Sequence, residues 1–254
     1  MTETSPAQGI RAKARHQMRE AILDAARAHL AENGAAGLSL RAVARDVGLV
    51  SSALYRYFDS RDALLTALII DAYDSLGAQV EAAEAAVARD DLLARWRAVA
   101  TTTRTWALAD PHQYALVYGS PVPGYAAPQD TVGPATRVTR VLADLLVDVA
   151  ASSGSADGTT AGATSAHGEP RRHPVHGPAA EAVAAAVAPV ATYSAGRVPT
   201  DLLVRGVMAW TYLFGAVSFE LFGQRHNVIA EDRSEDFFVE EVHRLAVLLG
   251  LDGP

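Results

Sequence analysis

The sequence contains no cysteine, and this absence removes several kinds of chemistry. Disulfide bonds, thiolate metal sites and a cysteine nucleophile are excluded, and a chain of this composition suits a reducing cytoplasm. Aromatic residues make up only 7% of the chain, yet 50% of it is hydrophobic and 20% is charged. These proportions are ordinary for a soluble protein that buries a core.

Long uninterrupted apolar runs are also missing. The longest candidate, residues 202–222, is interrupted by Arg205 and Glu220, so the sequence predicts no membrane-spanning helix. The polar start MTETSPAQGI leads into the basic run RAKARH, which is not typical of a signal peptide. We therefore expect a cytoplasmic protein with no membrane partner.

The motifs of common enzyme classes are absent as well. There is no dinucleotide-binding G-x-G-x-x-G, no P-loop and no H-E-x-x-H, and Ser120 lacks the spacing of a nucleophile elbow. His167, His173 and His176 lie near Glu169 in a Gly- and Pro-rich stretch, which favours a solvated loop over a metal site. The sequence thus predicts no enzyme, no cofactor and no metal.

The net charge of −7 hides a difference between the two ends of the chain. Residues 1–61 carry nine Arg or Lys and six Asp or Glu, whereas the remainder carries thirteen basic and twenty-three acidic side chains. Screening limits the reach of a charge to roughly 10 Å, so local charge decides phosphate binding. A basic N-terminal segment followed by an acidic remainder is a charge distribution that suits contact with DNA.

Apolar residues recur at helical spacing through most of the chain, and no β alternation stands out, so we expect an all-α fold. Residues 1–10 are interpreted as a disordered tail, 11–60 as a three-helix domain and 61–254 as a larger helical domain. Residues 151–178 are rich in Gly, Ser, Thr and Pro and are predicted to be a flexible insertion.

Local signals predict the helix boundaries of the N-terminal domain. Ser39 is expected to cap a short helix that Gly48 ends, and Asp59 or Ser60 to cap a longer one. The predicted helices span residues 11–33, 40–47, 51–57, 60–78, 92–108, 111–118, 134–150, 179–188 (ending at Pro189), 201–223 and 235–249.

The segment GLSLRAVARDVGLVSSALYRYF carries the functional signal. Two short helices joined at a glycine form a helix-turn-helix, in which the first helix holds the N-terminal end of the second toward a major groove. Leu54 and Phe58 are expected to bury themselves in the core, leaving the polar side chains between and before them exposed.

This segment resembles the TetR family of bacterial repressors. A first helix ending in NG, then GLSLRAVARDVGL, LYRYF and SRDALL, matches the family without a gap from Arg15 to Asp71. Val50 stands where the family commonly has Ser or another capping residue, and Ser51 is expected to take over the cap.

The resemblance implies a set of DNA contacts. Tyr55, Tyr57 and Arg61 are expected to bind phosphates, and Arg41 to read a base or a phosphate. Specificity is expected at the recognition-helix positions. The full predicted set is Arg41, Ser51, Ser52, Tyr55, Arg56, Tyr57 and Arg61. The alternative is that the arginines are ordinary solvated side chains. On charge alone, Arg11, Lys13 and Arg15 are a further basic arm.

In the larger domain, the run HQYALVYGSPVPGYAAPQDTVGPATRV resembles the C-terminal domain of one TetR subfamily, the WHG type. The resemblance implies a ligand pocket and a dimer interface. Aromatic walls and a few polar anchors give the ligand-binding candidates, each of which has core packing as its alternative. These are Trp96, Thr103, Trp106, His112, Tyr114, Tyr118, Tyr125, Arg137, Trp210 and Phe214.

The last two long helices are apolar over more than one face, which predicts a homodimer through a four-helix bundle. Small residues on these helices are expected to allow close approach of the two copies. The predicted face comprises Leu203, Val207, Trp210, Phe214, Val217, Phe219 and Leu221, then Phe238, Val242, Leu245 and Leu248, with the small residues Gly206, Ala209, Gly215 and Ala216.

The sequence therefore predicts a DNA-binding transcriptional regulator, a repressor released from its operator by a small-molecule effector. Two alternatives stay open. One is a DNA-binding regulator or architectural protein with no ligand response. The other is an enzyme fused to a DNA-binding domain.

Overall fold

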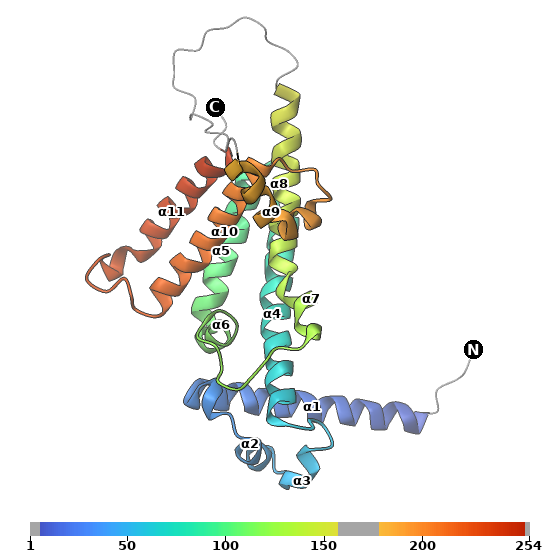
Figure 1. Ribbon diagram of the computed structural model, residues 1–254. Helices are drawn as coiled ribbons and strands as arrows, with labels where there is room; N and C mark the ends of the chain where they lie inside the picture. The colour runs from blue at the N-terminus through green and yellow to red at the C-terminus, as the bar shows by residue number, and fades with distance from the viewer. Residues whose placement is uncertain (1–5, 157–177, 252–254) are drawn as a thin grey trace, which may run out of the picture. The chain divides into compact units, whose positions relative to one another are not determined.

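The computed structural model describes residues 6–156 and 178–251, which form α-helices and short 3₁₀ turns and, within those ranges, no strand (Figure 1). The all-α prediction is confirmed. The chain divides into two compact units. Unit 1 comprises Met1–Ser75 and Ala109–Ala135, and unit 2 comprises Leu76–Leu108 and Thr136–Pro254. This division differs from the predicted boundary at residue 60. Residues 61–75, the start of the long helix after the helix-turn-helix, and residues 109–135 belong to the same unit as the helix-turn-helix.

Unit 1 is built around one cluster of buried apolar side chains. Its helices are α1 (Pro6–Asn33), α2 (Leu40–Asp46), α3 (Ser51–Leu54), the first part of α4 (Arg61–Ala85), α6 (Pro111–Tyr118) and α7 (Val132–Ala135). Ile22 of α1, Val43 of α2, Leu54 of α3 and Leu65 of α4 are all completely buried in this cluster. Four helices therefore share one core, and α2 and α3 have fixed places on it.

The caps predicted for α2 and α4 are confirmed. Ser39 Oγ accepts a hydrogen bond from the backbone N–H of Ala42 at 3.4 Å. Ser60 Oγ accepts one from the N–H of Ala63 at 3.0 Å. Gly48 follows α2 with a φ of 70°, a conformation that costs little only for glycine. These local interactions set where α2 ends and where α4 begins.

Several helix ends in unit 1 differ from the prediction. α1 begins at Pro6, not at residue 11, since proline is favourable in a first turn. α3 ends at Leu54, not at residue 57, because Tyr55–Tyr57 form a tighter turn in which Tyr57 N–H donates to Leu54 O at 2.8 Å. Val50 precedes α3 in an extended conformation without a side-chain cap, and Ser51 is the first helical residue, not the cap.

Unit 2 packs α10 against three other helices. Its helices are the end of α4, α5 (Leu92–Ala109), α8 (Arg137–Ala156), α9 (Pro178–Ala191), α10 (Thr200–Leu221) and α11 (Ser234–Leu249). α10 contacts α8, α9 and α11. A Cβ on Gly206 would lie 2.4 Å from Leu146 Cδ1, so glycine allows α8 and α10 to approach closely. Trp96 Nε1 of α5 donates to Val242 O of α11 at 2.9 Å.

Two boundaries in unit 2 also differ from the prediction. α8 continues through the first six residues of the predicted flexible insertion, to Ala156. α9 passes through Pro189 and ends at Ala191, because a proline near a helix end breaks only one backbone hydrogen bond. Residues 157–177, with the histidines considered as metal ligands, lie outside the described residues, as do residues 1–5 of the predicted tail.

α4 and α10 are each long and apolar enough to cross a membrane by length and composition. This differs from the expectation based on uninterrupted apolar runs. The core helix of a soluble protein meets the same criterion. Both helices bury apolar side chains within the units, such as Leu64 and Leu68 of α4 and Leu213 of α10.

Candidate nucleic-acid interface

Two buried side chains anchor the helix-turn-helix to the core of unit 1. Leu54 of α3 and Phe58, just beyond it, are 0% and 3% exposed. Leu49 N–H donates to Ala44 O at 2.8 Å and fixes the turn between α2 and α3. The guanidinium of Arg19 lies 4.5 Å from the centroid of the Phe58 ring, which couples α1 to the same segment. α3 is therefore held in place from its C-terminal end.

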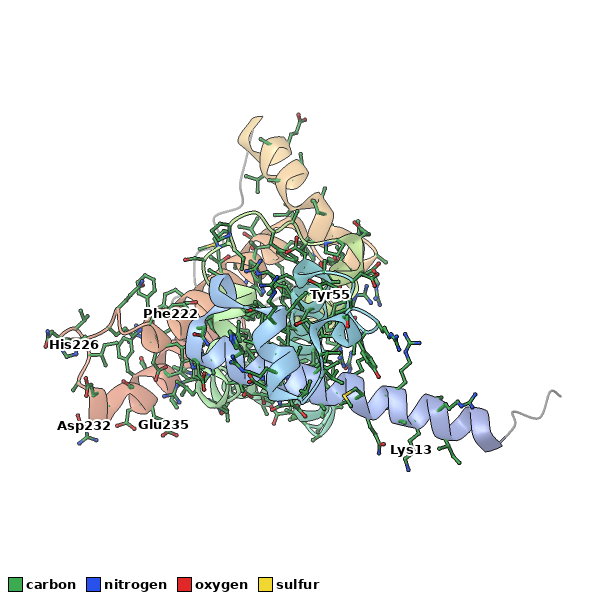
Figure 2. All side chains as sticks on the ribbon, turned by 90° about the horizontal axis from the view of Figure 1, so that it is seen from below. Lys13, Tyr55, Phe222, His226, Asp232 and Glu235 are labelled. Atoms are coloured by element: carbon green, nitrogen blue, oxygen red, sulfur yellow. The ribbon has the colours of Figure 1, made fainter. Side chains whose placement is uncertain are left out.

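The opposite side of α3 presents polar side chains to solvent. Ser51 and Ser52 form its exposed first turn, and Tyr55 is 50% exposed immediately after it. Arg56 and Arg41, the latter in the first turn of α2, are exposed as well. Five of the seven predicted DNA-binding residues are thus exposed, Arg41 on α2 and the other four on or directly after α3. Tyr55 is labelled in Figure 2.

Tyr57 is placed differently from Tyr55. It is half-buried and packs against the core of unit 1. The Arg15 guanidinium lies 6.0 Å from the centroid of its ring, and Arg15 Nη2 donates to Arg56 O at 3.3 Å. Tyr57 therefore joins the end of the recognition segment to α1, and a phosphate contact by its hydroxyl stays a prediction.

Arg61 was predicted to bind a DNA phosphate, but its guanidinium turns inward. Nη2 donates to Ala35 O at 2.7 Å and to Ala36 O at 3.3 Å, and Nε donates to Leu38 O at 3.1 Å. These carbonyls belong to the connection between α1 and α2, where Ala35 O also accepts the N–H of Leu38 at 3.4 Å. Arg61 therefore supports the connection that leads into the helix-turn-helix, and its phosphate contact stays a prediction.

This assignment gives a test on stability. Arg61→Gln is expected to lower the free energy of unfolding by about 1–2 kcal/mol, because carbonyl groups lose charge-assisted hydrogen bonds at a site that is only partly buried. Arg45→Gln is the matched control, since the Arg45 side chain is 80% exposed and should cost less than about 0.5 kcal/mol. Urea unfolding at fixed protein concentration measures both. If Arg61→Gln had normal stability and its DNA affinity depended less steeply on salt, the result would show that Arg61 binds a DNA phosphate instead.

The ten ligand-binding candidates divide between the units. His112, Tyr114, Tyr118 and Tyr125 lie in unit 1, and the other six lie in unit 2. Whether any of them binds a ligand stays a prediction, and the structure gives the packing of each within its own unit.

The tyrosines of unit 1 pack against each other. Tyr114 is fully buried, its ring centroid lies 5.0 Å from that of Tyr118, and Tyr73 meets Tyr118 edge-on at 5.9 Å. Burial raises the pKa of the Tyr118 hydroxyl far above its ordinary value, so this group stays protonated at physiological pH. Tyr125 OH lies 2.9 Å from Thr66 Oγ1. Core packing accounts for Tyr114 and Tyr118.

His112 lines a pocket of about 400 Å³ within unit 1. Its walls are mostly apolar and come from the end of α1, the 3₁₀ turn after it, α6 and the loop that follows α6. The lining residues are Leu30, Gly34, Ala35, Ala36, His112, Ala115, Leu116, Ser120, Pro121, Val122 and Pro123. The carbonyls of Ala35 and Ala36 also accept the hydrogen bonds of Arg61. The pocket therefore adjoins the connection that leads into the helix-turn-helix.

In unit 2 most candidates have structural partners. Trp96 and Trp106 are 0% and 1% exposed, and Thr103 Oγ1 donates to Val99 O of its own helix at 2.8 Å. Arg137, expected to anchor a ligand, donates to both carboxylate oxygens of Glu81 at 2.8 and 2.5 Å. Its hydrogen bond lowers the pKa of Glu81. Trp210 and Phe214 pack against one another, with ring centroids 5.7 Å apart.

α10 carries an apolar face that unit 2 leaves uncovered. Met208, Tyr212, Phe219 and Phe222 are 53%, 49%, 54% and 44% exposed, and their 4-7-3 spacing puts them on one side of the helix. On α11, Val239 and Val247 are exposed. This face overlaps only in part with the one predicted for dimerisation. The predicted Phe219 and Trp210 are exposed, whereas Leu203, Phe214, Val217, Phe238, Val242 and Leu245 are buried within the unit.

Most of the small residues expected at the dimer interface instead pack against other helices of unit 2. Ala209 and Ala216 are buried, and Gly206 faces Leu146. Only Gly215 has open space around it. The distinction between the two faces depends on which side of α10 packs on α8 and α11, which the apolar pattern of α10 alone does not reveal.

Two family models match the chain. The model described as bacterial regulatory proteins, tetR family, matches residues 22–68. The model described as tetracyclin repressor-like, C-terminal domain, matches residues 96–245, more than half of the chain. The first match contains α2, α3 and most of the unit 1 core. The second contains most of α5, all of α6 to α10 and most of α11.

Curated relatives and solved structures agree with these matches. The HTH-type transcriptional regulators Mb1846 of Mycobacterium bovis and Rv1816 of Mycobacterium tuberculosis are each 49% identical over 144 residues, which cover 54% of this chain and 59% of theirs. The chain thus spans less than two thirds of the length of these relatives.

Among solved structures, that of SCO4313, described as a regulatory protein, is similar over 92% of this chain and 97% of its own, with 32% identity and a TM-score of 0.70. A protein of unknown function from Rhodococcus sp. RHA1 shares the fold, with 20% identity and a TM-score of 0.61 over 92% and 95% of the two chains. The chain belongs to the tetR family of bacterial regulatory proteins.

Proposed function

We propose that this protein is a transcriptional regulator that acts in the cytoplasm by binding double-stranded operator DNA through α2 and α3. The observation that carries the proposal is the exposed polar stretch from Ser51 to Arg56 on a segment fixed by buried Leu54 and Phe58. A helix held in this way can present its first turn to base edges while neighbouring side chains bind phosphates. The names of the curated relatives support this function.

The direct test of this proposal is selection of DNA. The wild-type protein is incubated with a random-sequence duplex library, and bound duplexes are amplified and sequenced. A regulator of this kind enriches a two-fold symmetric sequence whose half-sites are about one helical turn, roughly 34–36 Å, or a multiple of it apart. Failure to enrich any sequence would contradict the proposal.

Tyr55 is proposed to donate its hydroxyl to a DNA phosphate. Tyr55→Phe is expected to weaken binding roughly twofold to tenfold, the loss of one hydrogen bond, and to do so equally on the selected operator and on unrelated duplex. Fluorescence anisotropy with both duplexes measures the change. Tyr193→Phe, the same substitution on a half-buried tyrosine of unit 2, is the control and should leave affinity unchanged. An effect confined to one operator base pair would show that Tyr55 reads a base.

We further propose that two copies bind one operator, joined through the uncovered apolar face of α10 and α11. Two half-sites require two recognition helices, and a two-fold axis uses the same surface on both copies. The exposed apolar side chains on α10 and α11 are the candidates for the interface of a four-helix bundle.

A small-molecule effector is the remaining part of the proposal. The pocket beside His112 suits a compact, mostly apolar molecule with one polar group, and it adjoins the connection between α1 and α2. Such a molecule would alter operator affinity only if it bound the two arrangements of this connection unequally. Compact apolar compounds can be screened for release of the selected operator. A compound that binds here and leaves operator affinity unchanged would favour a regulator without ligand response.

A further inference from the structure

One side of α1 changes from apolar to cationic along its length. Ile22, Ala26 and Leu30 are 0%, 0% and 2% exposed and form the stripe by which α1 joins the core. Arg11, Arg15 and Arg19 continue the same stripe toward the N-terminus at the same four-residue spacing, and all three are exposed. Side chains three and four positions apart share a helix face. The core-facing side of α1 therefore becomes a row of three guanidinium groups, which we call the arginine stripe.

The contacts of the arginine stripe show which way it faces. Arg19 lies over the ring of Phe58, and Arg15 donates to Arg56 O. Both contacts are to the segment directly after α3, next to exposed Tyr55. Arg11 is one helical turn beyond Arg15, about 6 Å further along the axis. The stripe thus runs outward from the recognition segment on the side that α3 occupies.

The first turns of α1 project beyond α2 and α3, with Lys13 on the projecting part (Figure 2). From Ile10 to Glu20 this part carries four Arg or Lys side chains and one carboxylate, that of Glu20, which lies 3.7 Å from the imidazole of His16. Lys13 is rotated by roughly 160° from both Arg11 and Arg15 about the helix axis. The projecting helix is therefore cationic, and its arginine stripe and Lys13 lie on opposite sides.

We infer that the arginine stripe binds phosphates of the DNA that flanks the half-site read by α3. This inference rests on the proposed DNA-binding function and extends it to DNA outside the half-site. Guanidinium groups bind phosphate strongly and without regard to base sequence. The regular spacing lets the stripe follow the duplex backbone where α1 passes the end of the recognition segment.

The test uses the full-length protein and the operator obtained from the random library. One duplex keeps ten base pairs on each side of the half-sites, and a second is trimmed to the half-sites themselves. Because two copies bind one operator, Arg11→Gln removes two phosphate contacts. It is expected to weaken binding to the long duplex roughly threefold to tenfold and to reduce the slope of log K against log salt by about 1.8. On the trimmed duplex it should match the wild type.

Lys13→Gln is the matched control, because it removes the same charge two residues away on the opposite side of α1. It should change neither the salt slope nor the dependence on flank length. Equal losses for Lys13→Gln and Arg11→Gln, or wild-type affinity that does not fall when the flanks are trimmed, would overturn the inference. Those results leave the proposed function intact, whereas failure of the library to yield any operator would contradict the function itself.

Discussion

Phe219→Glu is expected to convert the protein to a monomer and to reduce operator affinity by two or more orders of magnitude. Phe219 is 54% exposed on the apolar face of α10, between Tyr212 and Phe222. Burying an unpaired carboxylate in an apolar interface costs several kcal/mol, and two-fold symmetry introduces it twice. Each 1.4 kcal/mol is a tenfold change, so the dimer dissociation constant should rise by roughly a thousandfold or more. A monomer also loses the gain from binding two half-sites at once, about 10²- to 10⁴-fold.

Light scattering after size-exclusion chromatography measures the mass, and fluorescence anisotropy measures binding to the selected operator. Val132→Glu is the matched control, since Val132 is 45% exposed and belongs to α7 of unit 1, not to α10 or α11. It should remain dimeric and bind normally. A Phe219→Glu protein that is still dimeric, with unchanged affinity, would show that the two copies meet elsewhere.

The helix-turn-helix is the part of the fold that sequence predicts best, because its signals are local. Ser39 and Ser60 accept hydrogen bonds three residues ahead of them, and Gly48 adopts a positive φ, so each cap depends only on its neighbours. Leu54 and Phe58 are buried as the spacing predicted. Agreement of these signals in one short segment also made the family resemblance specific.

Side-chain roles that depend on distant partners were harder to predict. From the sequence, an arginine at the start of α4 can bind a phosphate or a distant backbone carbonyl. In the structure Arg61 donates to three carbonyls that lie twenty-three or more residues earlier in the chain. Arg137 likewise pairs with Glu81 on another helix. No local pattern encodes these pairs. By contrast, the four-residue spacing of Arg11, Arg15 and Arg19 is visible in the sequence and was the signal available for the arginine stripe.

The uncovered apolar face of α10 was also hard to predict from the sequence, because it depends on packing. α10 is apolar on nearly all sides, so its hydrophobic pattern does not separate the side that packs on α8 and α11 from the side left uncovered. Met208 and Tyr212 were therefore missed, although they are among the most exposed large side chains of the helix. Only the packing partners of α10 decide which residues remain for a second copy.

Arg95 is a charged side chain at a core position of α5, where an apolar residue is usual. It is completely buried in unit 2, beside Trp96. Nε donates to Glu84 Oε1 at 2.5 Å, and Nη1 donates to Asp148 Oδ2 at 2.7 Å and to Arg89 O at 3.0 Å. The partners come from the end of α4, the α4–α5 connection and α8. One guanidinium therefore joins three elements of unit 2.

Arg95→Met is expected to lower the free energy of unfolding by about 3 kcal/mol, the low end for a broken buried ion pair. It removes the buried cation from Glu84 and Asp148 and leaves them only Arg89, whose side chain is 64% exposed. Their side chains are only 12% and 29% exposed, so water replaces the guanidinium poorly. Urea unfolding at fixed protein concentration measures the change, since any dimer is stabilised by mass action. Arg97→Met, on the exposed side of the same helix, is the matched control and should change stability by less than about 0.5 kcal/mol.

A triple variant separates the loss of the cation from the loss of packing. Arg95→Met combined with Glu84→Gln and Asp148→Asn removes all three charges and should regain more than half of the stability lost by Arg95→Met alone, because no unpaired carboxylate is then left at the site. Recovery of this size identifies the charge network as the feature that holds α4, α5 and α8 together. If the triple variant were as unstable as Arg95→Met, the cost would lie in the packing of the arginine side chain, and the network would contribute little.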